Sequence, residues 1–179
     1  KKFLKLINFL PKYEFVYGSH NVQLQDKQYK NDFIKQNIYA EMVEKYKLKD
    51  ILKPGEVVYG EVYGDGVQKN YLYDANKNER KLIIFDVMIN GVWLNFVDAK
   101  HLIISRGLSF VPVLHVGKFD KSWVVTLSKG GSTLFPAQIK EGVVVKSYIE
   151  ERCYMGRKML KYINDEYLLK NQDNETIAH

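Results

Sequence analysis

The alternation of apolar and polar positions along the chain predicts many short β-strands. Strands are expected over residues 13–17, 22–24, 56–63, 81–89, 92–97, 110–116, 141–146 and 156–162. The first two flank the turn Gly18-Ser19-His20-Asn21, and Asn90-Gly91 is a strong hairpin signal between two later strands. Most connections are too short for the helical crossovers that parallel strands need, which favours antiparallel pairing.

Apolar residues at helical spacing occur in fewer places. One long helix is predicted from Asp32 to about Lys49, with Asn31 or Asp32 as its N-cap. A second helix is expected over residues 98–105, and residues 119–131 are predicted to form a mixed loop or short helix. Because strands dominate and the helices lie at the edges, the predicted fold class is α+β with largely antiparallel sheets.

Composition narrows the class of protein. A length of 179 residues with 46% hydrophobic and 27% charged residues fits one globular domain over residues 1–179. The single cysteine, Cys153, excludes an internal disulfide framework and favours a reducing cytoplasm, and four scattered histidines do not form a zinc motif. No apolar run approaches the roughly 20 residues that span a bilayer, so no membrane partner is expected. The net charge of +6 favours a polyanionic partner.

Two glutamates carry the strongest chemical signal. Glu61 and Glu141 each stand at a β-branched run where a plain strand would place an apolar residue. A short basic strand, Gly156-Arg157-Lys158-Met159-Leu160-Lys161-Tyr162, follows the second glutamate. Two acids and a pair of lysines on three strands that converge would form a phosphate-sized pocket, which predicts a nucleotide site.

Four segments resemble motifs III, IIIa, IV and V of the covalent nucleotidyltransferases, in the right order. They are Gly60-Glu61-Val62-Tyr63-Gly64-Asp65-Gly66-Val67-Gln68-Lys69-Asn70, Ile84-Phe85-Asp86-Val87, Glu141-Gly142-Val143-Val144-Val145-Lys146 and Arg157-Lys158-Met159-Leu160-Lys161. The first segment is most similar to ATP-dependent RNA ligases of the nick-sealing RNA ligase 2 type, and the resemblance runs from about Tyr13 to Tyr167.

The resemblance implies an adenylyltransferase domain, ATP-grasp-like, of two antiparallel sheets with flanking helices. It implies ATP and Mg²⁺ as cofactors, lysyl-AMP and RNA-adenylate intermediates, and RNA as the partner, as a nicked duplex or broken ends. Glu61 would hold the ribose hydroxyl and Phe85 would stack on adenine. Glu141 would bind metal or orient the nucleophile, and Lys161 would contact the α-phosphate. The remaining nucleotide-binding residues would be Asp86, Lys146, Arg157, Lys158 and His20.

The sequence departs from the family pattern in three places. No lysine is followed by glycine three positions later, so the Lys-x-x-Gly nucleophile motif is absent, and we expect the chain to be truncated just upstream of Lys1. Ile163 stands where many relatives have a second lysine, so Lys158 or Arg157 would have to replace that phosphate contact. His20 stands where many relatives have arginine, and it would give a weaker, pH-dependent contact.

Other interpretations of the same residues stay open. The fold would equally suit a DNA ligase or a capping guanylyltransferase, and a non-catalytic nucleic-acid-binding relative would also lack the nucleophile. Phe85 alternates with apolar residues and could belong to the core, and both glutamates could be solvent-side strand residues. Residues that could serve structure instead of chemistry are Tyr59, Tyr63, Tyr71 and Tyr73 (RNA stacking or sheet packing), His115 (a core histidine) and Lys129-Gly130-Gly131-Ser132 (a flexible loop).

Overall fold

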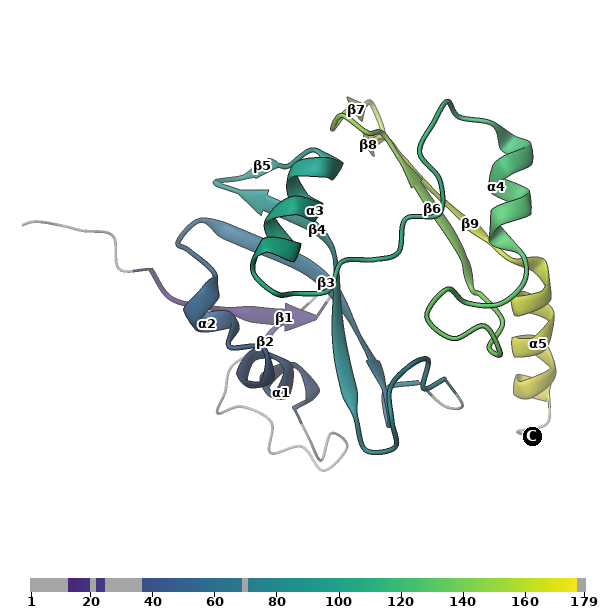
Figure 1. The fold of residues 1–179 in the computed structure, drawn as a ribbon, viewed down its shortest axis with the longest axis horizontal. Coiled ribbons are helices and arrows are strands. Elements are labelled where there is room, and N and C mark those ends of the chain that lie inside the picture. The colour runs from purple at the N-terminus through teal and green to yellow at the C-terminus, as the bar shows by residue number, and fades with distance from the viewer. Residues whose placement is uncertain (1–12, 20–21, 25–36, 69–70, 177–179) are drawn as a thin grey trace, which may run out of the picture. The chain divides into compact units, whose positions relative to one another are not determined.

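The structure is a computed structural model that describes residues 13–19, 22–24, 37–68 and 71–176 (Figure 1). The chain divides into two compact units, Lys1–Pro54 and Gly55–His179, and each is described by itself. The mixture of helices with antiparallel strand pairs confirms the predicted α+β class.

The first unit contains the predicted hairpin. Strand β1 (Tyr17–Ser19) pairs antiparallel with β2 (Val22–Leu24), and Tyr17 lies opposite Leu24. The strand predicted from Tyr13 is wrong at its start, because β1 begins only at Tyr17. The two-residue connection, which contains His20, lies outside the described residues.

Two short helices replace the long helix predicted for this unit. Helix α1 covers Ile38–Lys45 and α2 covers Leu48–Ile51. The Asn37 side chain caps α1 by accepting a hydrogen bond from the Ala40 amide at 3.1 Å. Lys47 adopts a left-handed backbone conformation with φ 50°, which breaks the predicted helix before Lys49. The predicted N-caps, Asn31 and Asp32, lie outside the described residues.

The main sheet of the second unit has the order β3-β4-β5, with β3 at Glu56–Gly64, β4 at Arg80–Ile89 and β5 at Val92–Trp93. The predicted Asn90-Gly91 hairpin is confirmed. Both residues have positive φ, 50° and 80°, as a type I′ turn requires. Strand β5 is shorter than predicted because Asn95 begins helix α3 (Phe96–Ser105), with Asp98 in its first turn.

A β-bulge interrupts the pairing of β3 with β4. Tyr59 lies opposite Asp86 while the next residue, Gly60, lies opposite Ile84, so Phe85 is left without a partner across the sheet. Ile84 is 1% exposed and Val87 is fully buried, whereas Phe85 is 40% exposed. The bulge therefore presents one aromatic side chain to solvent from an otherwise buried strand.

Helix α3 covers β4 and closes this part of the core. Ala99 and Ile103 are fully buried. Arg106, at the end of α3, donates two hydrogen bonds of 2.6 and 2.7 Å to the Glu56 carboxylate at the start of β3. The strand predicted over residues 110–116 is wrong: only Phe110 forms a bridge, to Ile84. Pro112 has no N–H to continue the ladder.

The rest of the second unit contains two small antiparallel pairs. Strand β6 (Gly142–Lys146) pairs with β9 (Met159–Ile163), and β7 (Arg152–Cys153) pairs with β8 (Gly156–Arg157). Helix α4 (Lys121–Ser128) lies beside β6 and β9, and α5 (Asp165–Thr176) follows β9 (Figure 1). The single strand predicted over residues 156–162 is therefore divided at Lys158 into β8 and β9.

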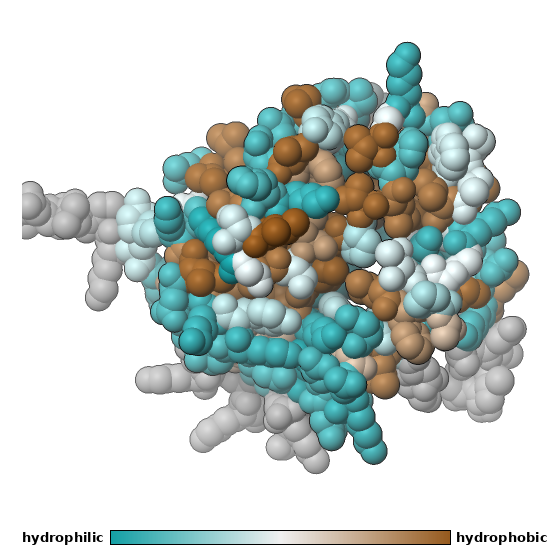
Figure 2. All heavy atoms as spheres, in the orientation of Figure 1, coloured by the Kyte–Doolittle hydropathy of each residue, from teal (hydrophilic) through white to brown (hydrophobic). Residues whose placement is uncertain are grey.

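The surface is mixed in character. Figure 2 shows apolar side chains interspersed with hydrophilic ones on the face that it draws. Within the described part of the chain, the helices are all too short or too polar to cross a membrane.

Candidate active site

Glu141 and Lys161 meet at the paired strands β6 and β9. Glu141 lies immediately before β6, and Lys161 lies within β9 opposite Val144. The Lys161 Nζ atom is 2.5 Å from Glu141 Oε1, and the two side chains remain 57% and 39% exposed. This hydrogen bond is the main cause that raises the pKa of Lys161. The pair is therefore charged, hydrogen-bonded and accessible to a ligand.

The close approach of β6 and β9 explains why the residue after Glu141 is a glycine, Gly142. A Cβ atom at this position would lie 2.1 Å from the Tyr162 carbonyl oxygen and 2.8 Å from the Ile163 Cα atom. Both contacts are to backbone, which cannot rotate away. Only glycine lets β6 and β9 approach this closely, and the approach brings the Glu141 carboxylate to Lys161.

Asn164 holds the backbone beside Glu141, and no sequence motif marks it. It is only 2% exposed. Its amide N–H donates to the Glu141 carbonyl at 2.8 Å, and its side-chain Nδ2 donates to the Lys140 carbonyl at 3.1 Å. Its Oδ1 accepts a hydrogen bond from the Glu166 amide in the first turn of α5. The main-chain N–H of Asn164 therefore holds the backbone of Glu141, and its buried side chain holds the backbone of Lys140 and the start of α5.

Glu61 brings a second carboxylate to this pair from strand β3. The Glu61 side chain is exposed, and partial desolvation by its neighbours is the main cause that raises the pKa of its carboxyl; the negative charge of Glu141 raises it further, while Lys161 lowers it. The three residues predicted as catalytic thus act on one another electrostatically. We call Glu61, Glu141 and Lys161 the carboxylate centre.

Tyrosine rings pack beside the carboxylate centre. The rings of Tyr63 and Tyr73 meet edge to face at 5.7 Å, and Tyr71 lies 5.9 Å from Tyr73 and 6.0 Å from Tyr167. Burial, followed by the charge of Glu61, raises the pKa of Tyr73 to about 12. Tyr63 and Tyr71 are buried, so for these two the packing interpretation is correct and RNA stacking is not.

Asp86 is the centre of a separate internal network. Its side chain is 1% exposed and accepts hydrogen bonds from Lys146 Nζ at 3.1 Å and Arg157 Nη1 at 2.5 Å. Arg157 also forms a bidentate pair with Glu150, at 2.6 Å for both bonds, and stacks on Trp93 at 3.9 Å from the ring centre. We call Asp86, Lys146, Arg157 and Glu150 the Asp86 network. It joins β4, β6 and β8.

Phe85 lies next to this network but points away from the core. Its side chain is exposed at the bulge, while its carbonyl oxygen accepts a 3.3 Å hydrogen bond from Lys146 Nζ. Phe85 is therefore not a core residue, although strand alternation alone would make it one. Its backbone is held by the Asp86 network and its ring is free to meet a ligand.

Comparison with known proteins identifies the family of the chain. The RNA ligase family model matches residues 7–163, which is most of the sequence. The chain belongs to the RNA ligase family. This confirms, at the level of the family, the resemblance that the four motifs indicated. No curated protein matches this RNA ligase-family chain.

Solved structures of Naegleria gruberi RNA ligase share the fold of this RNA ligase-family chain. The structure with pyrophosphate has a TM-score of 0.66 at 18% identity, over 88% of this chain and 48% of that one. A mutant with AMP and manganese gives 0.67 at 18% identity over the same shares. A mutant with ATP and manganese gives 0.61 at 19% identity, over 74% and 40%. The chain thus spans about half the length of the chains it matches.

Lys158, a predicted site residue, takes part in neither cluster. Lys158 forms an exposed ion pair with Glu151 at 2.8 Å on the surface of the β7–β8 region. His20 lies outside the described residues, so its predicted ligand contact stays a prediction. His115 was interpreted as a core histidine, and that is wrong: it is exposed and stacks on Trp123 at 5.4 Å.

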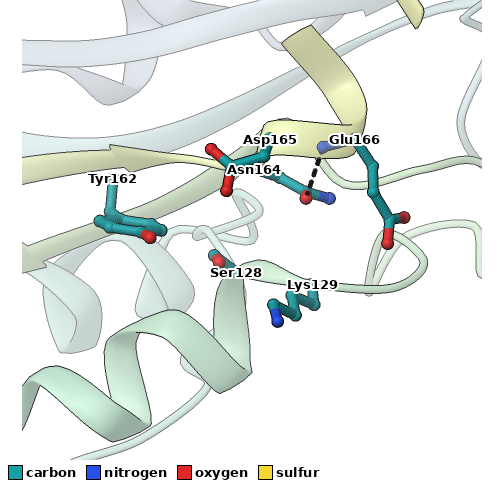
Figure 3. A pocket seen from close by; sticks show the side chains of 6 residues that line it. All are labelled: Ser128, Lys129, Tyr162, Asn164, Asp165 and Glu166. Atoms are coloured by element: carbon teal, nitrogen blue, oxygen red, sulfur yellow. Dashed lines mark hydrogen bonds between the residues drawn. The ribbon is translucent and has the colours of Figure 1, made fainter. Parts of the chain in front are cut away.

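A small pocket at the start of α5 includes part of the glycine-rich loop. Its walls come from Ser128, Lys129, Tyr162, Asn164, Asp165 and Glu166 (Figure 3). Its volume of about 170 Å³ is below the roughly 300–1,000 Å³ of typical ligand pockets. Two acidic side chains also line it, which disfavours a phosphate. The pocket contains none of the predicted site residues, and the loop interpretation of Lys129-Gly130-Gly131-Ser132 is retained.

The donors of the carboxylate centre fit a magnesium ion that shares its coordination with a substrate. No group of three or more His, Cys, Asp or Glu side chains suited to a metal occurs within the described residues. Glu61 and Glu141 supply two carboxylates. Mg²⁺ is commonly held by one or two carboxylates together with waters and substrate phosphates, so a larger protein cage is not required.

Proposed function

We propose that this chain is the adenylyltransferase domain of an ATP-dependent RNA ligase of the RNA ligase 2 type. It would serve to join RNA 3′-hydroxyl and 5′-phosphate ends in a nicked duplex or at breaks, through lysyl-AMP and RNA-adenylate intermediates. The observation that carries this proposal is the meeting of Glu141 with Lys161 at 2.5 Å, with Glu61 close enough for its charge to contribute to the raised pKa of Lys161.

The carboxylate centre matches the charge pattern of phosphoryl transfer. Catalysis of this reaction consists mainly of positioning the phosphate and stabilising its developing charge. Lys161 supplies a cation for the α-phosphate, and its raised pKa keeps it protonated at neutral pH. Glu61 accepts a hydrogen bond from a ribose hydroxyl. Glu141 binds Mg²⁺, which when bound would neutralise phosphate charge.

Phe85 supplies the surface for the adenine ring. It is an exposed aromatic side chain on a strand whose backbone is fixed, which suits stacking of a base. The Asp86 network holds the Phe85 backbone, because Lys146 Nζ donates a hydrogen bond to the Phe85 carbonyl oxygen. We assign Asp86, Lys146 and Arg157 to holding β4, β6 and β8 in place, since their charged atoms already bind one another. Lys158 and His20 remain predicted phosphate or ribose contacts.

Sealing of a nicked RNA duplex by the complete gene product tests the proposal. Glu141→Ala and Lys161→Ala should each reduce sealing at least about 100-fold, because each removes a preorganised charge at the phosphate. Glu44→Ala and Lys49→Ala, which each remove one member of an exposed ion pair, should leave sealing unchanged. Near-normal sealing by the Glu141 or Lys161 variant would make these residues structural and would contradict the proposal.

Nucleotide and substrate choice separates the alternatives. Covalent labelling by GTP instead of ATP would indicate a capping guanylyltransferase, and sealing of DNA but not RNA nicks would indicate a DNA ligase. RNA binding by the complete gene product without any labelling would indicate a non-catalytic relative. A Lys-x-x-Gly segment encoded in frame upstream of Lys1 would support the enzyme. A role in RNA repair and a cytoplasmic location complete the proposal, the latter because the sequence has one cysteine.

A further inference from the structure

Two aromatic side chains stack on each other at the surface of the second unit. The rings of His115 and Trp123 lie nearly parallel, with 12° between their planes and 5.4 Å between their centres. Trp123 is 50% exposed, and His115 is exposed as well. Tryptophan side chains are on average highly buried in folded proteins, so stability alone does not explain this placement. We call His115 and Trp123 the aromatic platform.

Helix α4 anchors the aromatic platform to the fold. Val124 and Ser128, one turn apart on α4, are buried, and the helix contacts β6 and β9 (Figure 1). Trp123 stands next to this buried stripe but is half exposed. His115 comes from the segment 112–120 before α4, which is exposed throughout. The platform is therefore a surface feature on a fixed helix.

Gly117 leaves space for the stacked histidine. A Cβ atom at this position would lie 2.7 Å from His115 Nε2, closer than side chains normally approach. Gly117 is not among the glycines with positive φ, so its backbone does not itself require glycine. The absence of a side chain here instead makes room for the His115 ring beside Trp123.

Positively charged side chains alternate with aromatic ones along the same segment. Phe119 is 66% exposed, and Lys118 and Lys121 close to it in the sequence are exposed. The acid between them, Asp120, serves as the N-cap of α4, because its Oδ1 accepts 2.7 Å hydrogen bonds from the amide and the hydroxyl of Ser122. Aromatic rings that stack on bases, next to lysines that attract phosphates, are the combination that binds unpaired nucleic acid.

We propose that the aromatic platform, together with Lys118 and Lys121, binds the unpaired bases of a single RNA strand. Double-stranded RNA does not suit this chemistry, because its bases are already stacked inside the helix. The platform contains no residue of the carboxylate centre or of the Asp86 network, so it is a separate contact. Binding of the strand does not depend on the proposed function. Its use in sealing, to favour ends that carry unpaired nucleotides, rests on that function.

Fluorescence anisotropy with a short labelled oligouridylate in EDTA tests this binding without any ATP chemistry. Trp123→Leu should weaken oligouridylate binding roughly 5- to 150-fold, the loss that follows when a base loses its aromatic partner. Binding of a blunt RNA duplex of the same length should not change. The matched control is Tyr154→Leu, which removes a 95% exposed ring between β7 and β8 and should leave both affinities unchanged.

Gly117→Ala is a second variant that keeps every ring and every charge. Its methyl group displaces only the His115 ring, so oligouridylate binding should weaken while the melting temperature stays close to that of the wild type. This variant decides the question if Trp123→Leu impairs folding. Lys118→Ala should reduce the slope of log Kd against log salt by about 0.7, as expected for one phosphate contact on a single strand. Lys77→Ala, which removes an exposed lysine elsewhere, should leave that slope unchanged.

Three results would overturn the inference. They are oligouridylate binding that the folded Trp123 and Gly117 variants leave unchanged, an equal loss of affinity for single strand and duplex, and a dimer that Trp123→Leu converts to a monomer without any effect on oligouridylate. The last would assign the aromatic platform to a second copy of the chain. Lys161→Ala should bind oligouridylate as the wild type does. Normal sealing by that variant would contradict the proposed function alone and would leave the platform in place.

Discussion

Individual side chains in this protein have surroundings that strand alternation does not reveal, and Phe85 is the clearest case. Its neighbours on β4, Ile84 and Asp86, are each 1% exposed, yet the bulge leaves Phe85 40% exposed. An exposed aromatic residue in a buried strand has little value for stability. We propose that its value lies in binding, so mutation of this residue should separate stability from affinity.

The Phe85→Leu variant should keep its fold and lose nucleotide affinity. A swap of similar volume usually costs under about 1.5 kcal/mol, and exposure of the ring reduces this further. Loss of base stacking is worth roughly 1–3 kcal/mol, or about 5- to 150-fold in Kd for ATP. Urea unfolding and calorimetric titration on one sample measure both.

Phe135→Leu is the control for this prediction, because Phe135 is 43% exposed and lies in the loop before β6. It should bind ATP as the wild type does. Equal ATP affinity of the Phe85 variant and the wild type, with a lower melting temperature for the variant, would remove Phe85 from the site.

Glu61 is a residue whose ionised form opposes stability. Its folded-state pKa is raised above the ordinary value of 4.5, chiefly by partial desolvation, so the ionised form is disfavoured in the folded protein. Glu61→Gln resembles the protonated acid. At neutral pH it should therefore melt at a slightly higher temperature than the wild type, and the difference should vanish below about pH 4.5, where both side chains are neutral. Thermal scans across pH measure this, and a less stable variant at neutral pH would contradict it.

At the level of secondary-structure elements, the Asp86 network holds three strands together through one buried carboxylate. Lys146 comes from β6 and Arg157 from β8, and their side chains are only 17% and 14% exposed. Removing the carboxylate leaves two cations without their shared partner in a poorly solvated place. Asp86→Asn should therefore cost roughly 3–5 kcal/mol of unfolding free energy, seen as a lower urea midpoint at constant slope.

Glu151→Gln provides the contrast to Asp86→Asn. It makes the same change of acid to amide in an exposed pair with Lys158, whose side chains are 50% and 64% exposed. Solvent screens such pairs, so the midpoint should not move. Equal losses in the two variants would show that burial of the Asp86 network contributes nothing.

The sequence predicted elements well where turn chemistry was local and poorly where pairing was distant. Asn90-Gly91 specifies its own hairpin, and β3 and β4 were found close to their observed limits. The division at Lys158 was not foreseen, because β8 pairs locally with β7 whereas β9 pairs with the more distant β6. The meeting of Glu141 with Lys161 was expected from motif order, whereas Asn164 carries no motif and acquires its role only through burial.

At the scale of the whole molecule, lysine side chains supply most of the positive charge that an RNA ligand would contact. The chain has four arginines and a net charge of +6. Three of the arginines donate to acceptors in the protein: Arg80 to the Asp65 carbonyl, Arg106 to Glu56 and Arg157 to Asp86 and Glu150. Lysine is a compact, flexible charge without bidentate geometry. Binding of RNA by such a surface should depend strongly on salt and weakly on sequence.

Covalent chemistry tests the assignment of the chain as a whole. The family's reaction begins with a lysine nucleophile in a Lys-x-x-Gly motif, and no lysine in the 179 residues has glycine three positions later. The isolated chain should therefore bind ATP weakly through Phe85, Glu61 and Lys161 without becoming adenylylated. Incubation with α-labelled ATP and magnesium, followed by denaturing electrophoresis, should give no labelled band. A labelled band would mean that another lysine is the nucleophile and that the motif assignment is wrong.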